Sequence, residues 1–432
     1  MGSPVVGVRG AAVAASVLLL TACGGGSSPA KKAAATSTPA AEATRAPTDS
    51  DQLEQLLITR ANALAVGDVD GFVATATGRQ VVKDRRAIAR ANALPLADVA
   101  MTERTLEVNG DRATLQVNLI YAFDGIDTQY VKRSRMRARK SEDGWRFASD
   151  RPSAGELAPW EYKRYKARTS RHFLALAPAN LKVGSLMKDL EKGRERMQDG
   201  LPGVKAPGRV LVIVARDGED TKALTKNWHT LSALVAVAEA QVTTKGPARR
   251  VAAVASQRVF VLWRSFGDRS ADERRMVIAH ELTHLALARK TGGRVPAWLV
   301  EGTAMYASGD QRAGEAGALL SGGRLEDASK QGEAEHALSL KGALARPSAL
   351  DRMSAIPLAV AYSYSSAAAY AIAQNHGGAK TLLRLYSAFN KKRFRGKPGR
   401  ELSDKVFRKT LHSSLESIEE EVDAYARANS SL

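Results

Sequence analysis

Apolar and polar residues first form a regular pattern shortly after residue 50. Apolar side chains recur every three or four positions over residues 53–64, ahead of a Gly-Asp pair, and this spacing predicts an amphipathic helix. A second helical pattern covers about 81–94. Apolar and polar residues then alternate, with a hairpin signal at Asn109-Gly110, which predicts antiparallel strands. The expected strands are 98–108, 112–123, 128–140 and 144–150. Helices followed by such a meander favour an α+β domain over residues 51–150.

The pattern changes beyond residue 150. Two helical stretches are expected first, at 157–176 and 181–199. Apolar runs then predict three strands, at 208–215, 248–255 and 257–263. Helical patterns continue nearly to the end of the chain, at 271–290, 296–308, 362–376, 378–390 and 413–428. We therefore expect a second α+β domain over residues 151–432, with a small sheet followed by a helical bundle.

The first 50 residues carry the features of an export signal and a tether. Arg9 precedes the apolar run AAVAASVLLL, and the chain then reads LTAC up to Cys23, the only cysteine. This order is typical of a secretory signal, and LTAC resembles the lipobox of bacterial lipoproteins. We expect residues 1–22 to be a signal peptide and Cys23 to be lipid-modified; a plain signal peptide with an incidental cysteine is the alternative. Residues 23–50, rich in Gly, Ser, Ala, Thr and Pro, predict a flexible tether, so the protein is expected on the extracytoplasmic face of the cell membrane.

The 432-residue chain carries a formal net charge of +19, which favours anionic surroundings such as anionic lipid or wall polymer. The basic cluster KKRFRGK at 391–397 is either such a contact or a solvated loop. Four arginines alternate with Ser, Met and Ala and so share one face of a strand: Arg133, Arg135, Arg137 and Arg139. A solvated outer face is favoured there over an anion site. No nucleic-acid partner is expected, because aromatic and basic residues are not interleaved.

The stretch IAHELTHLALARKTGGRVPAWLVEGTAMYAS, residues 278–308, carries the candidate chemistry. His280 and His284 lie four residues apart on a predicted helix, so their imidazoles project from one face, about 40° apart. That spacing lets two ring nitrogens reach one zinc ion at about 2.1 Å. Glu281 can face a zinc-activated water without binding the ion, which is the HExxH arrangement with a general base. Two helix histidines satisfied by hydrogen bonds are the alternative.

A zinc ion with two histidine ligands needs a third protein ligand and an open position. Leu287 and Lys290 stand where a metzincin would have glycine and histidine, which excludes that class. The segment WLVEG follows, with Ala304 two residues later. Together with HELTH it resembles the gluzincin metallopeptidases, especially the peptidase MA-like branch with its W-L-x-E-G-x-A motif. The resemblance implies that Glu301 is the third zinc ligand, in a gluzincin-type domain with a small sheet and a helical bundle.

The same resemblance implies further parts of the site. In aminopeptidase-like gluzincins a tyrosine at the start of a helix that ends in Gly-Gly steadies the oxyanion; counted back from Gly377, Tyr362 fits that spacing and Tyr364 is the substitute. Both tyrosines can instead be packing residues. Met305 stands where thermolysin-like members have an aspartate, so that subgroup is not expected. In gluzincins the edge strand before the HExxH helix pairs with extended substrate, and strand 257–263 is expected in that place.

The helix-and-meander pattern of residues 51–150 resembles the NTF2-like, or cystatin-like, folds. The whole sequence therefore predicts a membrane-tethered zinc metallopeptidase with one zinc ion, acting on peptide or protein substrates, with an NTF2-like domain ahead of it. An endopeptidase is favoured, because no G-x-M-x-N motif is present to anchor a free amino terminus.

Two alternatives remain open. One is a non-catalytic zinc-containing lipoprotein that acts as a binding or scaffold module through its N-terminal domain. The other is an NTF2-like enzyme with an inert helical part, which the lack of histidine in residues 51–150 disfavours. Glu281 favours the peptidase, because a structural zinc site has no use for a general base.

Overall fold

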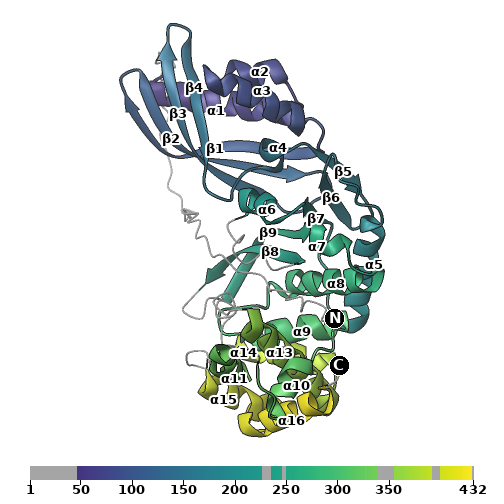
Figure 1. Cartoon of the computed structure of the whole chain (residues 1–432). Coiled ribbons are helices and arrows are strands. Elements are labelled where there is room, and N and C mark those ends of the chain that lie inside the picture. Colours follow the sequence, from purple (N-terminus) through teal and green to yellow (C-terminus); the bar gives the residue numbers. More distant parts are fainter. Residues whose placement is uncertain are drawn as a thin grey trace, which may run out of the picture.

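The computed structural model describes residues 46–225, 235–245, 250–325, 327–338, 340, 355–391 and 399–430. The body is elongated: an N-terminal part, a five-stranded sheet with its helices, and a C-terminal helical bundle follow one another along it (Figure 1). The expected α+β class is confirmed. The expected signal peptide and the expected lipidation site at Cys23 lie outside the described residues.

The N-terminal part packs helices against a four-stranded antiparallel sheet. Its helices are α1 (Asp49–Val66), α2 (Val69–Ala74) and α3 (Arg79–Ala91), and its strands pair in the order β1 (Leu96–Asn109), β2 (Arg112–Phe123), β3 (Tyr130–Ser141) and β4 (Gly144–Pro152). A capping box between Thr48 and Asp51 starts α1, and Gly67 ends it with a left-handed φ of 74°. The expected helices and strands of this part are confirmed, and α2 is an addition. Its likeness to NTF2-like folds stays a prediction.

Strand β3 turns its arginines outward. The side chains that alternate with them are buried, as Met136 illustrates. Arg133 forms an ion pair with Glu156 at 3.0 Å. The other three arginines are exposed: Arg135, Arg137 and Arg139. The prediction that they share one face is confirmed, and that face is a solvated one.

The helix expected at 157–176 is wrong. That segment forms only the short helix α4 (Pro159–Tyr162), followed by strands β5 (Tyr165–Thr169) and β6 (Phe173–Pro178). Every residue of β6 is buried. A short apolar run that is buried on both faces has no period that distinguishes a strand from a helix, which explains the error. The next expected helix is confirmed as α5 (Leu186–Gly200).

The two strands expected at 248–255 and 257–263 form one strand, β9 (Arg250–Leu262). It pairs with β8 (Ala236–Lys245), which the sequence pattern did not indicate. The register shifts where Gln241 pairs with Ser256 but the next residue of β8 pairs with Val254. This β-bulge breaks the alternation of β9 and explains why one strand was taken for two.

The second sheet has the strand order β5-β6-β7-β9-β8, with β7 (Val210–Ala215) in its centre. β6, β7 and β9 run parallel, and β5 and β8 pair antiparallel at the two edges. Val212 of β7 packs on the side of α5 and α8 (Ala271–Leu287), and its neighbour Ile213 packs with Trp160 and the N-terminal part. The sheet is therefore sandwiched between helices and the N-terminal part, and one hydrophobic core joins the two parts of the chain.

The C-terminal bundle is built around the apolar helix α13 (Ala355–His376). Its other helices are α9 (Ala297–Ser308), α10 (Gly314–Leu320), α11 (Gln331–Ala337), α14 (Ala379–Phe389), α15 (Arg400–Thr410) and α16 (Leu415–Ala428). Short connecting helices are α6 (Gly218–Leu224), α7 (Trp263–Gly267) and the 3-10 helix η2 (Ala328–Lys330). Helix α13 is long and apolar enough to cross a membrane, but 83% of that span is buried within the protein, as expected of a core helix. The expected helices of this region are confirmed, and α10, α11 and α15 are additions.

Candidate metal centre

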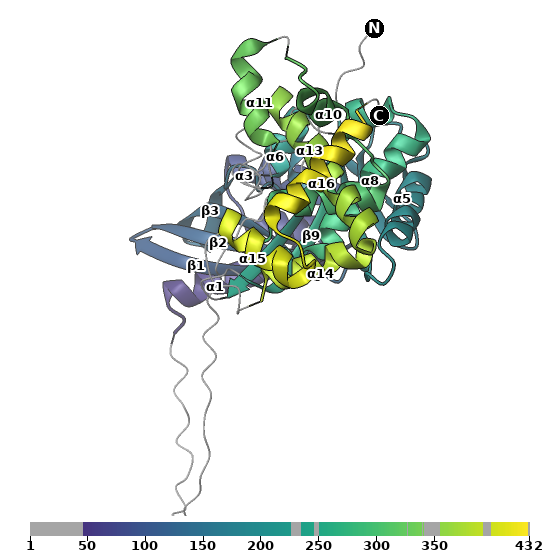
Figure 2. The same ribbon diagram turned by 90° about the horizontal axis from the view of Figure 1, so that it is seen from below.

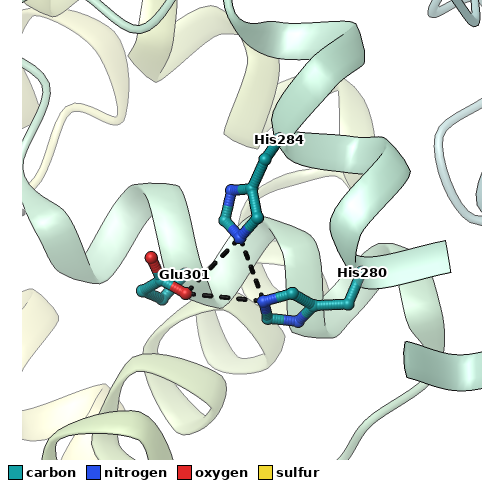
Figure 3. A group of neighbouring side chains, drawn as sticks. All are labelled: His280, His284 and Glu301. Carbon is teal, nitrogen blue, oxygen red and sulfur yellow. Dashed lines mark hydrogen bonds and ion pairs between the residues drawn. The ribbon is translucent and has the colours of Figure 1, made fainter. Parts of the chain in front are cut away.

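The two histidines of the HELTH segment lie on α8, a helix with a defined start. The Ser270 hydroxyl accepts a hydrogen bond from the backbone N–H of Glu273, whose carboxylate accepts one from the N–H of Ser270. Further along the helix, the imidazoles of His280 and His284 project from one face (Figure 3). Their Nε2 atoms lie 3.0 Å apart. The helical spacing read from the sequence therefore does bring the two ring nitrogens together.

Glu301 reaches the histidines from the neighbouring helix α9 (Figure 3). Its Oε2 lies 3.4 Å from His280 Nε2 and 3.6 Å from His284 Nε2. Among the described residues, these three side chains form a group that could hold a metal ion, with their donor atoms all within 4.8 Å of one another. The structure thus brings together the three residues that the sequence predicted as ligands.

Gly302, next to Glu301, allows α9 to approach α13 closely. A Cβ atom at this position would overlap the backbone carbonyl oxygen of Ser365 and lie 3.0 Å from the side chain of Ala369. A larger residue would push α9 away from α13 and displace the neighbouring carboxylate. The glycine of the WLVEG segment therefore has a packing role that sets the position of Glu301.

The separations among the donor atoms suit a tetrahedral zinc ion. Two atoms bound to zinc at about 2.05 Å lie about 3.3 Å apart in a tetrahedron, and the observed separations are 3.0, 3.4 and 3.6 Å. The two N···O separations exceed the usual N–H···O distance of about 2.9 Å. Within the described part of the chain, Glu301 Oε2 accepts no hydrogen bond. The two Nε2 atoms are also within hydrogen-bond distance of each other, but the position of Glu301 fits a shared metal ion better than hydrogen bonds to the histidines.

The three side chains are buried, and burial and charge shift the pKa of two of them, His280 and Glu301. They are 1%, 6% and 1% exposed for His280, His284 and Glu301. Burial lowers the pKa of His280, which keeps its imidazole neutral. Burial alone would raise the pKa of Glu301, but its interactions with the two histidines outweigh this and lower the pKa to about 2. A neutral imidazole and an ionised carboxylate are the forms that bind a metal.

Glu281, next to the first histidine, is fully buried and held by one backbone group. Its Oε2 accepts a hydrogen bond of 2.6 Å from the N–H of Ala238 on β8. Its Oε1 has no hydrogen-bond partner among the described residues. Burial raises the pKa of Glu281 well above its usual value, although the bond from Ala238 opposes this. One oxygen is therefore fixed, while the other stays available to a proton on an incoming group.

The strand that flanks the site at the edge of the sheet is β8, and the expectation that 257–263 would be this edge is wrong. Residues 257–262 belong to β9, which pairs with β7 on one side and β8 on the other. The N–H of Ala238 points toward α8, since it donates to Glu281. β8 reads AVAEAQVTTK, and its many alanines carry little strand propensity, which explains why the sequence pattern missed it.

Gln257 of β9 connects the N-terminal part to the histidine helix. The hydroxyl of Tyr130 donates to the backbone oxygen of Gln257 at 2.8 Å, and the Gln257 side chain donates to the backbone oxygen of Leu285 at 2.7 Å. Leu285 directly follows the second histidine. Beside this path, Arg258 pairs with Glu239 of β8 at 2.5 Å. These contacts connect α8 and β8, through β9, to the N-terminal part. No sequence motif indicated them.

Tyr386 of α14 lies close enough to Glu301 for the carboxylate to affect its pKa. Burial and the nearby Glu301 carboxylate raise the pKa of Tyr386, whose hydroxyl lies beside Thr291 and Thr303. Met305 occupies the position of the thermolysin-type aspartate and is itself buried in the bundle core. The polar surroundings of this carboxylate therefore include a tyrosine far along the chain.

The two candidate oxyanion tyrosines lie on different sides of α13. Tyr364 donates to the Asp423 carboxylate of α16 at 2.9 Å, which turns its hydroxyl toward the C-terminal helix. Gly302 of α9 lies against Ser365 of α13. Tyr362 is three residues before Ser365, so it lies on the same side of α13, which faces α9. It is buried and close enough to affect the pKa of Arg312. The geometry disfavours Tyr364, and the role of Tyr362 stays a prediction.

Comparisons with known proteins add no assignment. No protein-family model matches the chain, and no curated protein shows significant similarity to it. The interpretation of the site therefore rests on its own residues and geometry.

Proposed function

We propose that the protein is a gluzincin-type zinc metallopeptidase, tethered to the outer face of the cell membrane through Cys23. The observation that carries the proposal is the buried triangle of His280, His284 and Glu301, with Glu281 next to it on the same helix. The tether rests on the LTAC sequence at Cys23. Peptide or protein substrates are proposed, with cleavage inside the chain.

The donor set suits one zinc ion and leaves one tetrahedral position for water or substrate. Bound there, zinc would lower the pKa of a water molecule and polarise the scissile carbonyl. His280, His284 and Glu301 would hold it in a site whose burial strengthens every charge interaction. The packing of α9 against α13 at Gly302 keeps the third ligand in place.

Glu281 would act as the general base and then as the general acid. It takes the proton of the attacking water on Oε1 and passes it to the leaving amine. The N–H of Ala238 fixes the other oxygen, and a carboxylate with a raised pKa is a stronger base. Tyr362, on the α9 side of α13, is proposed to donate a hydrogen bond to the oxyanion that forms.

A zinc site without catalysis is the second candidate, and one observation favours it. All three ligands and Glu281 are buried, as in structural zinc sites. In that case the protein would be a zinc-containing lipoprotein that binds partners through its N-terminal part. A structural site, however, would not need the carboxylate of Glu281, whose Oε1 has no partner among the described residues.

The decisive experiment compares the zinc-loaded protein with its Glu281→Gln variant on a mixed peptide library read by mass spectrometry. The amide keeps the shape of the side chain but cannot take a proton, so cleavage should fall by about 10²–10⁴-fold. Zinc content, measured on the same samples, should be equal in both proteins. If both proteins bind stoichiometric zinc and neither cleaves any peptide, the structural site is favoured. If neither protein binds zinc, the metal site itself is refuted.

A further inference from the structure

Basic side chains gather around two adjoining shallow hollows away from the metal ligands. The first hollow, of about 520 Å³, lies between α14 and α15, and its lining contains no acidic residue. Its cations are Lys290, Lys380, Arg384, Lys391 and Lys409. The second, of about 690 Å³, lies between the end of α8, the loop before β7 and the β2–β3 connection. Its cations are Lys205, Arg209, Arg289 and Lys290, with Asp127 as its one acidic residue. Lys290 lines both hollows, so these eight cations form one basic surface.

The cations of the basic surface differ from many others in this protein in having no acidic partner. Several buried or half-buried arginines elsewhere form ion pairs with carboxylates, as in the pair of Arg60 with Asp84 and that of Arg258 with Glu239. Among the described residues, none of the eight cations forms an ion pair with a carboxylate. Arg384 donates instead to the neutral hydroxyl of Thr381. The basic surface therefore keeps its full positive charge toward solvent.

Such a surface calls for a partner with several negative charges. Like charges placed around two joined hollows repel one another, and a multivalent anion relieves that repulsion while releasing counterions. Seven of the eight cations are exposed, and Arg209 is half-buried. The hollows are open and shallow rather than enclosed, so they can receive groups that are presented on another surface.

We propose that the basic surface docks the protein onto the anionic phospholipids of a membrane, with headgroup phosphates in the two hollows. The first described helix supports this choice: α1 and α14 lie along the same side of the molecule, at the lower edge of the view in Figure 2. The start of α1 therefore lies on the same side of the molecule as α14, which lines the first hollow. There are 25 residues between Cys23 and Asp49, and a flexible chain of that length has a mean end-to-end span of about 25–30 Å. That span keeps the body near the bilayer.

The size of the effect follows from the charges. A basic residue close to an anionic membrane strengthens binding by about fivefold. Removing three such residues should therefore weaken binding by about a hundredfold, and reversing their sign should weaken it further. High salt should release the protein, because the screening length falls to about 3 Å at 1 M.

The test uses the full chain with Cys23→Ser, which cannot be lipidated, in co-sedimentation with vesicles. The vesicles contain phosphatidylcholine alone or mixed with phosphatidylglycerol. The apolar residues of the expected signal peptide, 1–22, should contribute equally to binding of both kinds of vesicle. The test variant carries Lys290→Glu, Lys380→Glu and Lys409→Glu. The control carries Lys83→Glu, Arg86→Glu and Lys188→Glu, exposed residues of α3 and α5 with the same change in net charge. Circular dichroism and thermal melting verify that both variants fold.

We expect the protein with the unmodified surface and the control variant to prefer the anionic vesicles. The test variant should bind these vesicles at least about a hundredfold more weakly. These results together would support the docking surface. Equal binding by the two variants would overturn it, as would binding that ignores lipid charge. A third outcome also overturns it: no binding to anionic vesicles together with binding to linear polyphosphate would mark the surface as a track for a soluble polyanion. None of these readings depends on zinc or on peptidase activity.

Discussion

The helix pair α8–α9 and the hairpin β8–β9 border the same site. Only the contribution of the helix pair to that site could be recognised in the sequence. The helix pair supplies His280, His284 and Glu301. The spacing of four residues between the two histidines is a local property of a helix. The hairpin supplies the backbone N–H of Ala238, which holds Glu281. No side chain in the hairpin carries the chemistry, so its sequence has no motif. Chemistry held by side chains is visible in a sequence, and chemistry held by a backbone group is not.

The two regions should also differ in how they fail. In the helix pair, a change at His284 is expected to remove the metal and a change at Gly302 to destabilise the fold around it. In the hairpin, loss of the Ala238 N–H should leave the metal bound and affect only the proton transfer. The following predictions separate these outcomes, from the largest effect to the smallest.

Loss of a ligand should be the most damaging change. In His284→Ala the site keeps two of its three donors, so stoichiometric zinc and activity should be lost. With zinc at about a thousand times its dissociation constant, the ion stabilises the folded protein by about 4 kcal/mol. Addition of a chelator should lower the melting temperature of the natural protein and leave that of the variant unchanged. The exposed His412→Ala is the control, and a chelator effect that persists in His284→Ala would exclude this residue as a ligand.

Overpacking between α9 and α13 should cost about 3 kcal/mol in the free energy of unfolding. In Gly302→Ala the new methyl group overlaps the Ser365 carbonyl and displaces Glu301. Gly332→Ala on α11 is the matched control, because its Cβ meets no atom within 4 Å and should be neutral or slightly stabilising. Urea denaturation measures both variants. Equal stability of the two would show that α9 lies farther from α13 than described.

Removing the backbone donor in the hairpin should lower turnover by about tenfold to a hundredfold, the range for a hydrogen bond to a charged group. Ala238→Pro deletes the N–H that holds Glu281, and proline is tolerated on an edge strand where that N–H does not join the ladder. Zinc content should not change. Ala238→Gly keeps the donor and should remain active. A proline variant that loses its zinc would place the hairpin among the elements that hold the metal.

The smallest effect is expected from the contact between β9 and the histidine helix. Gln257→Leu removes the bond to the Leu285 carbonyl and should cost about 1 kcal/mol of stability, with activity lowered by less than about tenfold. Tyr130→Phe removes the hydroxyl that reaches the same residue from the N-terminal part. A larger loss of turnover than of stability in both variants would indicate that the N-terminal part positions the site.

Much of the fold followed from pattern, and the failures have physical causes. The meander of the N-terminal part was predicted because apolar and polar residues alternate along it, and buried and outer side chains do alternate in β3 and in the first half of β2. Strand β6 was missed because both its faces are buried, and β9 was divided because a bulge interrupts it. The two histidines were paired because a helix places residues four apart on one face, and Glu301 was added through the resemblance of WLVEG to the gluzincin motif. Spacing alone favoured Tyr362 over Tyr364, and only the packing of α13, which turns the Tyr364 hydroxyl toward Asp423, gives a structural reason to disfavour Tyr364.

The sequence by itself determined the donor set, the helix that carries the histidines and the excess of positive charge. These are properties of residue identity and of short-range spacing, which a helix or a strand expresses without help from distant parts of the chain. The tertiary structure decided which strand forms the edge beside the site and which backbone N–H holds Glu281. It also decided where the cations gather, because Lys205, Lys290 and Lys409 meet only when α8, the loop before β7 and α15 pack together. Contacts between residues far apart in a chain depend on how whole elements fill space, and no local spacing encodes that.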